Sequence, residues 1–243
     1  MNFDTVSMEQ TVRRWTSHPD TGVRIGIAVI LLWAIMLVLN FQYEINWYSP
    51  ITYLLIFIQG HLFTGLFITA HDAMHGCVAP QNPKLNHAIG KVASFLFVFN
   101  SYKKLMPKHF SHHKYAGTDQ DPDFHNGNGN FFSWYLDFGK EYISWQQVLM
   151  AAITFNVLEY GLGIPKENLI LYWVIPSLLG TFQLFYFGTF LPHMGEHDNK
   201  HHARSQKRNH MWAFLTCYFF GYHFEHHDSP NTPWWKLWEL KEG

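Results

Sequence analysis

The chain has 243 residues, of which 48% are hydrophobic, 18% aromatic and only 14% charged, whereas soluble proteins carry roughly 25% charged residues. Its net charge of -1 and the lack of a basic arm argue against a nucleic-acid-binding protein. The two cysteines, Cys77 and Cys217, lie far apart and support neither a disulfide framework nor a cysteine-based zinc site. The composition predicts a membrane protein, and the absence of a linker-like break predicts one domain over residues 1–243.

The chain begins with a polar segment, residues 1–24, followed by an uncharged apolar run at 25–41. With its flanks this run approaches the ~20 residues that span a bilayer, and its long polar start favours a retained helix over a cleaved signal peptide. The second run, 51–70, is also uncharged and leads directly into His71. Both runs predict membrane-spanning helices.

Three further apolar runs and one segment of mixed character follow. Residues 85–99 include a lysine and are expected to be re-entrant or half-buried, and residues 131–162 mix aromatic with charged residues as an interfacial segment does. Residues 169–191 are uncharged and predict another span, and a short apolar run occupies 211–222. The pattern predicts an all-α integral-membrane helical bundle.

Lysine and arginine gather before the first run and in the histidine-rich stretches, whereas the connection at 42–50 has neither. Positive residues favour the cytoplasmic side of a membrane protein. The sequence therefore predicts a multi-pass protein whose termini and histidine-rich stretches face the cytoplasm, with 42–50 on the opposite side.

Seventeen histidines are present, and most fall in four short boxes: HDAMH at 71–75, HFSHH at 109–113, HMGEH at 193–197 and HFEHH at 223–227. On a helix, residues three and four apart share a face, so each box can direct two or three imidazoles at one volume. One such box alone is more often solvated than metal-binding, but four in one small chain are not expected by chance. The candidate metal ligands are His71, His75, His109, His112, His113, His193, His197, His223, His226 and His227.

Ten converging imidazoles exceed what a single ion takes, since a zinc site uses three or four protein ligands. The sequence therefore predicts a site for two metal ions. Imidazole suits zinc, copper and iron alike, but the HExxH motif of zinc proteases and the ExxH pair of soluble di-iron bundles are both absent. An all-histidine di-iron site that activates dioxygen against a C–H bond remains the favoured interpretation. Its place at the membrane interface suits a lipid-dissolved substrate and a soluble electron donor.

Carboxylates near the boxes are expected to accept imidazole N–H bonds and so orient the ligands. For residues 119–123 the alternative is an ordinary polar loop with a proline turn. The candidates are Asp72, Asp119, Asp121, Asp123, Glu196, Glu225 and Asp228. The histidines outside the boxes are expected to be solvated, locally hydrogen-bonded or packed; they include His18, His61, His87, His125 and His210.

The residues between the histidines add a resemblance that covers the chain from about Arg24 onward. The motifs are HDAMHG at 71–76, HFSHH with GTDQDPDF at 109–124, FGTFLPH at 187–193, HHARS at 201–205, and YHFEHH followed by PWW at 222–235. In these motifs the chain resembles the bacterial-type β-carotene ketolases, which belong to the wider histidine-box group of membrane desaturases and hydroxylases.

The resemblance implies a fatty acid desaturase-like fold with a di-iron site at the cytoplasmic face. It implies two Fe2+ ions, O2 as co-substrate and an external reductant such as ferredoxin. The implied reaction is two successive hydroxylations at C4 of the β-ionone ring, after which the gem-diol loses water to give a ketone. β-Carotene would yield echinenone or canthaxanthin, and zeaxanthin would yield astaxanthin.

The resemblance assigns metal roles to the boxed histidines other than His193. His193 stands where related desaturases use an asparagine, so it ligates either directly or through water. His201, outside the boxes, matches a family position and is a candidate for the layer behind the ligands.

Two other classes of function remain open from the sequence. A carotenoid β-ring 3-hydroxylase or a fatty-acyl oxygenase would share the histidine boxes. A non-enzymatic membrane metal-binding protein or transporter would need polar helices forming a path, and the apolar runs at 25–41, 51–70 and 169–191 have no charged residue. The 22 Phe, 12 Tyr and 10 Trp suit an apolar slot for a rigid polyene, although aromatics are common in membrane helices generally.

Overall fold

The computed structural model describes residues 20–195 and 197–242, and the part of the chain it describes is helical. Three helices in this part are long and apolar enough to cross a membrane: α2 (Thr21–Gln42), α3 (Pro50–Met74) and a continuous helix over Lys166–His193. The last comprises α8 (Lys166–Leu169), η2 (Ile170–Val174), α9 (Ile175–Phe185), η3 (Tyr186–Phe190) and α10 (Leu191–His193). The all-α membrane bundle predicted from the sequence is confirmed.

Helix α2 shows how the spans divide their surface. Its buried residues recur every three or four positions along one face, whereas the apolar side chains between them are about half exposed. The buried set is Gly22, Gly26, Val29, Trp33, Leu37 and Asn40. An outward face of leucine, isoleucine and valine is what a helix in lipid requires.

Helices α3 and α9 pack closely through small residues. A Cβ on Gly180 would lie 3.0 Å from the Cβ of Phe63 and 3.2 Å from the carbonyl oxygen of Gly60. The hydroxyl of Thr64 donates to Gln183 at 2.6 Å across this contact. Small residues and interhelical hydrogen bonds are the usual means of joining helices where lipid removes the hydrophobic driving force.

Helix α4 (Pro83–Leu96) has 14 residues and packs against α3. At about 1.5 Å per residue it is shorter than the ~30 Å hydrocarbon core, so the run at 85–99 does not span, in line with the expectation of a re-entrant segment. The helix ends because Val98 and Phe99 adopt left-handed backbone conformations, with φ of 51° and 56°.

The run at 211–222 is interrupted in the same way. Helix α11 (His210–Cys217) ends where Tyr218 and Phe219 have φ of 48° and 67°. The chain then turns into the six-residue helix α12 (His223–Asp228), and a 3-10 helix, η4 (Trp234–Lys241), follows. Eight residues are too few to cross a bilayer.

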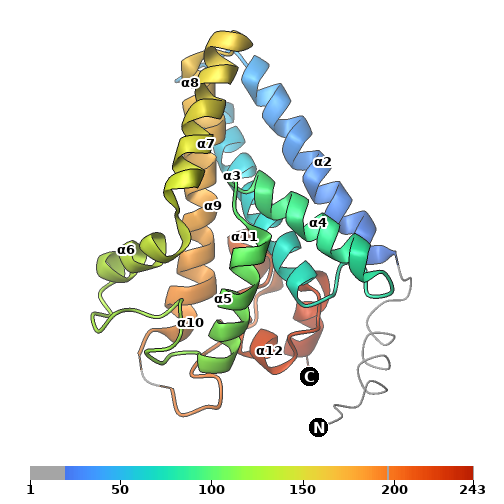
Figure 1. The fold of residues 1–243 in the computed structure, drawn as a ribbon, viewed down its shortest axis with the longest axis vertical. Coiled ribbons are helices and arrows are strands. Elements are labelled where there is room, and N and C mark those ends of the chain that lie inside the picture. Colours follow the sequence, from blue (N-terminus) through green and yellow to red (C-terminus); the bar gives the residue numbers. More distant parts are fainter. Residues whose placement is uncertain (1–19, 196, 243) are drawn as a thin grey trace.

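The remaining helices flank the spans. Helix α5 (Tyr102–Tyr115) descends from α4, α6 (Phe131–Tyr142) is a short side helix, and α7 (Trp145–Asn156) continues through the π-helical turn η1 (Val157–Gly161). Helix α7 rises along the same side of the molecule as α9 and has no fully buried residue (Figure 1). Residues 145–161 therefore form one upright helix, where an interfacial segment was expected at 131–162.

The ends of α3, α5 and α10 and the whole of α12 meet at one end of the bundle (Figure 1). This end carries the histidine boxes.

Candidate metal centre

Four helices deliver the clustered histidines. His71 lies in the last turn of α3 and His75 follows it as the C-cap, while α10 ends at His193. Helix α5 contributes His109, His112 and His113, and α12 contributes His223, His226 and His227. Because the boxes are helical, members four residues apart point to one cluster of histidines, whereas His112 and His226, three residues after the first member of their boxes, point to a neighbouring cluster.

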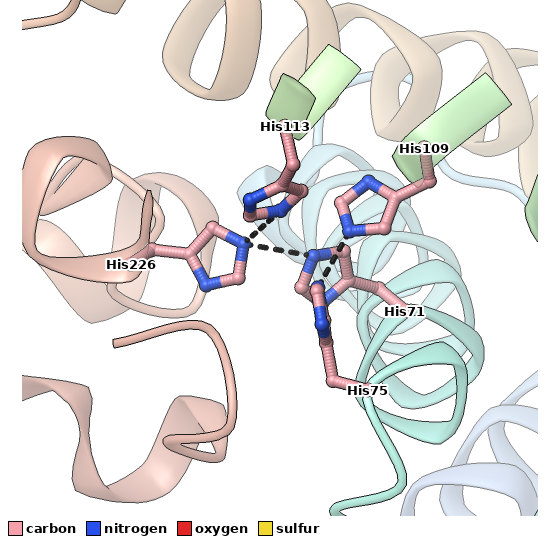
Figure 2. A group of neighbouring side chains, drawn as sticks. All are labelled: His71, His75, His109, His113 and His226. Carbon is pink, nitrogen blue, oxygen red and sulfur yellow. Dashed lines mark hydrogen bonds between the residues drawn. The ribbon is translucent and has the colours of Figure 1, made fainter. Parts of the chain in front are cut away.

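The first histidine group contains His71, His75, His109, His113 and His226, and its candidate ligand atoms all lie within 4.8 Å of one another. Figure 2 shows these rings converging from three helices. The Nε2 atoms of His71 and His226 are 3.2 Å apart, and those of His226 and His113 are 3.0 Å apart. The Nε2 atoms of His75 and His109 are 2.6 Å apart.

The second histidine group contains His112, His193, His223 and His227. The Nε2 atom of His223 lies 2.9 Å from that of His193 and 3.4 Å from that of His112. The Nε2 atoms of His227 and His112 are 3.1 Å apart. The groups are neighbours, because the rings of His113 and His227 stack with centroids 4.2 Å apart.

These spacings fit nitrogen ligands around an ion. Metal–nitrogen bonds of about 2.0–2.1 Å place adjacent ligand nitrogens roughly 3.0 Å apart in octahedral geometry and roughly 3.4 Å apart in tetrahedral geometry. The Nε2–Nε2 distances quoted for the two groups range from 2.6 to 3.4 Å. Hydrogen bonding alone explains the arrangement poorly, since each imidazole has only two ring nitrogens to donate or accept. Each group suits one metal ion.

Several of the imidazoles are held in the neutral form that binds metals. Burial lowers the pKa of His113 to about 2 and that of His75 to about 3. Burial, and then the neighbouring imidazoles, also hold the pKa values of His223 and His226 well below the usual range.

His112 differs because two carboxylates lie behind it. Its Nδ1–H donates to both oxygens of Asp121, at 2.9 and 3.0 Å, and Asp123 lies 3.8 Å away. Burial alone lowers the pKa of His112, but the charges of Asp123 and Asp121 outweigh it and the pKa is raised. Asp121 also accepts the backbone N–H of Gly117 at 3.0 Å, so the carboxylate is fixed in place. Such a partner orients a ligating imidazole and strengthens it as a base.

Two more ligands are oriented from behind. His71 Nδ1–H lies 3.3 Å from Asp72, whose other oxygen accepts the backbone N–H of Trp234 at 3.0 Å. His193 Nδ1–H donates to the carbonyl of His202 at 2.9 Å, which leaves its Nε2 directed at the second group. His193, for which the sequence left direct and water-mediated ligation open, lies with the ring nitrogens of the second group.

His197 lies outside both groups. Helix α10 ends at His193, Met194 is extended and Gly195 has φ of 89°, so the helical geometry that would pair positions 193 and 197 is lost. Glu196 lies outside the described residues.

Only some of the carboxylates predicted to orient the histidines contact an imidazole. Asp72, Asp121 and Asp123 approach imidazoles, whereas Asp119 is exposed. Glu225 instead contacts Ser205 and Lys241, because its side chain lies on the face of α12 away from the histidines. Asp228 pairs with Lys200 and with His201, the latter at 3.4 Å. The ring centroid of His201 is 5.5 Å from that of His227, which puts it beside the second group.

The unboxed histidines that the structure describes have other surroundings. His87 bonds the hydroxyl of Tyr102 at 3.1 Å, and His210 bonds Glu242 at 2.7 Å. His61 stacks on Tyr218 with centroids 4.3 Å apart.

A cavity of about 300 Å3 opens beside both groups. It borders His71, His109 and His226 of the first group and His112 and His223 of the second. Its apolar wall includes Phe67, Phe97, Leu105, Phe138, Val148 and Leu184. The cavity therefore brings an apolar ligand against both histidine groups.

Tyr142 was not predicted from the sequence. It lines the cavity and donates its hydroxyl to Asp123, which faces His112. Tyr142 lies 29 residues after His113, the nearest boxed histidine, so only its aromatic surroundings on α6 hinted at a cavity wall.

Comparison with known proteins agrees with this geometry. The sequence profile of the fatty acid desaturase family matches residues 46–144 and 134–242, and the chain belongs to that family. A β-carotene ketolase of a Paracoccus species is 43% identical over 180 residues, which is 72% of this chain and 73% of that one. The zeaxanthin 4-ketolase of Chlamydomonas reinhardtii is 36% identical over 89% of this chain and 52% of its own length.

More distant similarity reaches lipid desaturases. The sn-1 oleoyl-lipid 12-desaturase of a Picosynechococcus species is 23% identical over 74% of this chain and 65% of its own. The resemblance to the β-carotene ketolases is confirmed.

Proposed function

We propose that the chain is a β-carotene ketolase that oxidises C4, and C4′ at the other end, of the β-ionone ring to a ketone. The observation that carries the proposal is the apolar cavity that borders both histidine groups. The ketolase relatives supply the substrate class. The products would be echinenone and canthaxanthin from β-carotene, or astaxanthin from zeaxanthin.

The proposed occupants of the histidine groups are two ferrous ions, one held by each group. Iron there would supply the redox chemistry with O2 that attack on a C–H bond demands and that zinc lacks. The chain's own residues would hold the ions through Nε2, keep the imidazoles neutral and exclude water with the aromatic wall.

The reaction balance requires a reductant. Each hydroxylation consumes one O2, two electrons and two protons, inserts one oxygen atom at C4 and releases one water. A second hydroxylation at the same carbon gives a gem-diol, which loses water to form the ketone. A ferredoxin-type carrier would deliver the four electrons needed for each ketone.

One face of α5 suits such a carrier. Lys103, Phe110 and Lys114 lie along this face and are exposed. The Phe110 ring centroid is 5.5 Å from that of His75 and 5.9 Å from that of His109. An acidic carrier docked here would sit one aromatic ring from two proposed ligands. We expect activity to fall as ionic strength rises, because salt screens such docking; a rate unchanged across the salt series would contradict it.

The cavity admits one end of the substrate. Its volume of about 300 Å3 lies at the lower limit for small-molecule sites, and a forty-carbon polyene needs more room. Val148 of α7 and Leu178 of α9 border the cavity and are also more than half exposed on the outer surface of the bundle. A ring would enter laterally from the membrane, and the two rings would be oxidised in separate binding events.

The test is to express the protein in bacteria that accumulate β-carotene, separate the pigments and identify them by mass spectrometry. Echinenone or canthaxanthin is expected. His112→Ala and His226→Ala, one from each group, should abolish ketone formation while the protein still inserts in the membrane. Zeaxanthin as the sole product would instead indicate a 3-hydroxylase. A purified protein with stoichiometric zinc, and no O2 consumption with reductant and carotene, would favour a metal-binding protein or transporter.

A further inference from the structure

Most polar side chains of the cavity wall already have partners for their donors. Gln147 Nε2 donates to Asn100 Oδ1 at 2.9 Å, and Asn100 Nδ2 donates to the carbonyl of Phe97 at 2.7 Å. The hydroxyl of Tyr142 donates to Asp123. Gln147 Nε2 donates its second hydrogen to the carbonyl of Val98 at 3.4 Å, and the single hydroxyl hydrogen of Tyr142 is also used, whereas Asn100 keeps one amide hydrogen.

The wall also carries three aliphatic hydroxyls, and one of them differs from the others. Ser177 donates to the carbonyl of Val174 at 2.8 Å, and Thr181 donates to that of Ser177 at 3.0 Å. Thr189 lines the cavity, is 4% exposed, and makes no hydrogen bond to any of the described residues. The hydroxyl oxygen is not among the fully enclosed polar atoms that lack a partner, so it keeps access to the cavity, whose contents can supply one.

The local backbone explains the difference. Two buried threonines in regular helices, Thr69 and Thr216, donate to the carbonyl four residues earlier, to Gly65 at 2.8 Å and to Trp212 at 2.7 Å. Thr189 instead lies in the π-helical turn η3. Such turns alter the alignment with the preceding carbonyls and are frequent at functional sites.

Thr189 is also close to the metal centre along its own helix. It precedes His193 by four residues on the same continuous helix, and the cavity it lines also borders His112 and His223 of the second histidine group. Its hydroxyl therefore belongs to the cavity end that lies nearest the second histidine group.

The substrate offers this hydroxyl a hydrogen-bonding partner only after the first hydroxylation. The ring of β-carotene has no polar atom, whereas the ring hydroxylated once carries an oxygen at C4. We propose that the Thr189 hydroxyl hydrogen-bonds this C4 hydroxyl and holds the ring in place for the second hydroxylation. The inference rests on the proposed function and makes Thr189 the residue that favours ketone over released alcohol.

The first experiment measures binding in the iron-free protein, reconstituted in lipid nanodiscs. Thr189→Val removes the hydroxyl with little change of shape, and carotenoid binding is followed by quenching of tryptophan fluorescence. The dissociation constant for 4-hydroxy-β-carotene, divided by that for β-carotene, should rise about threefold to tenfold, which is the usual worth of one hydrogen bond. Thr189→Ser should restore the ratio. Thr216→Val, which removes a buried hydroxyl away from the cavity, should leave it unchanged.

The second experiment measures products in carotene-accumulating bacteria. Thr189→Val should release 4-hydroxylated carotenoids where the parent protein gives ketones, and Thr189→Ser should return the ketone. An unchanged binding ratio together with an unchanged ketone fraction would overturn the proposal and leave the hydroxyl bonded to water. If the parent itself forms no C4-oxidised product, the proposed function fails, whereas a ketone-forming parent with an unaffected Thr189→Val variant overturns only the role of Thr189.

Discussion

Three histidines present Nε2 to their group while an oxygen atom accepts a hydrogen bond from Nδ1. For His112 the acceptor is Asp121, for His71 it is Asp72, and for His193 it is the carbonyl of His202. Fixing Nδ1 in this way sets the tautomer and leaves the Nε2 lone pair for a metal. These contacts orient the Nε2 atoms of the three rings toward their groups.

The Asp121 carboxylate provides a residue-scale prediction. Asp121→Asn keeps an oxygen that can accept the His112 N–H but removes the charge, so we expect ferrous affinity or ketone yield to fall about tenfold to hundredfold. Asp119→Asn is the matched control, because Asp119 is exposed two residues away. Metal titration of the purified variants measures the effect, and equal behaviour of the two variants would argue against an orienting role for Asp121.

Nine of the ten boxed histidines predicted from the sequence lie in the two groups, because helical spacing keeps the members of a box close together. The spacing did not predict that His112 and His226 would join the other group from their box partners. It did not predict the loss of His197, because nothing in HMGEH shows that the helix stops at its first residue. Nor did it separate Asp121 from Asp119, since their difference arises from the turn around Gly117. The sequence shows that Thr189 lies four residues before His193, but it does not show that the Thr189 hydroxyl lacks a hydrogen bond, which we attribute to the π-helical turn.

At the scale of elements, the contact between α3 and α9 carries α10 into position at the metal centre. A Cβ at Gly180 would press on the Cβ of Phe63 and on backbone atoms of Gly60 and Thr64. These backbone atoms cannot move aside to relieve the contact as the end of a flexible side chain can.

We therefore expect Gly180→Ala to destabilise the fold by about 1–3 kcal/mol, as overpacking does. Gly139→Ala is the control, since its Cβ would meet only the Ile143 side chain at 3.9 Å and alanine favours helix. Denaturant titration of both variants in mixed micelles gives the comparison. A Gly180→Ala protein as stable as the parent would show that the two helices separate more easily than the structure implies.

The three spans were predictable because each is an uncharged run near bilayer length. The ends of the shorter helices were not, because Val98, Phe99, Tyr218 and Phe219 adopt left-handed backbone without the glycine that usually announces it. These helix ends depend on tertiary packing, because Phe97, next to the first break, and Phe220, next to the second, pack in the same hydrophobic core. Helix α7 escaped prediction because the charged residues of 131–162 masked the apolar stretch that begins at Trp145.

At the scale of the whole molecule, the histidine groups gather at one end of the bundle and the connection between α2 and α3 lies at the other (Figure 1). We propose that the end with the histidine groups faces the cytoplasm, because positive residues in the histidine-rich stretches favour that side of a membrane.

Single cysteines test this orientation. Tyr48→Cys, at a position 98% exposed between α2 and α3, should react with an impermeant thiol reagent added to intact cells. Lys200→Cys, exposed near the histidine groups, should react only after the cells are opened. Background should be low because Cys77 and Cys217 are both buried. The reverse labelling pattern would contradict a cytoplasmic metal centre.

The central claim is that two neighbouring histidine groups each hold one iron. The direct measurement is the number of ferrous ions bound per chain after anaerobic loading and removal of excess metal. We expect two for the parent, and His226→Ala and His227→Ala should each weaken one site while the other still fills, because the two residues belong to different groups. A parent that binds a single ion, or both variants losing all iron at once, would contradict the account.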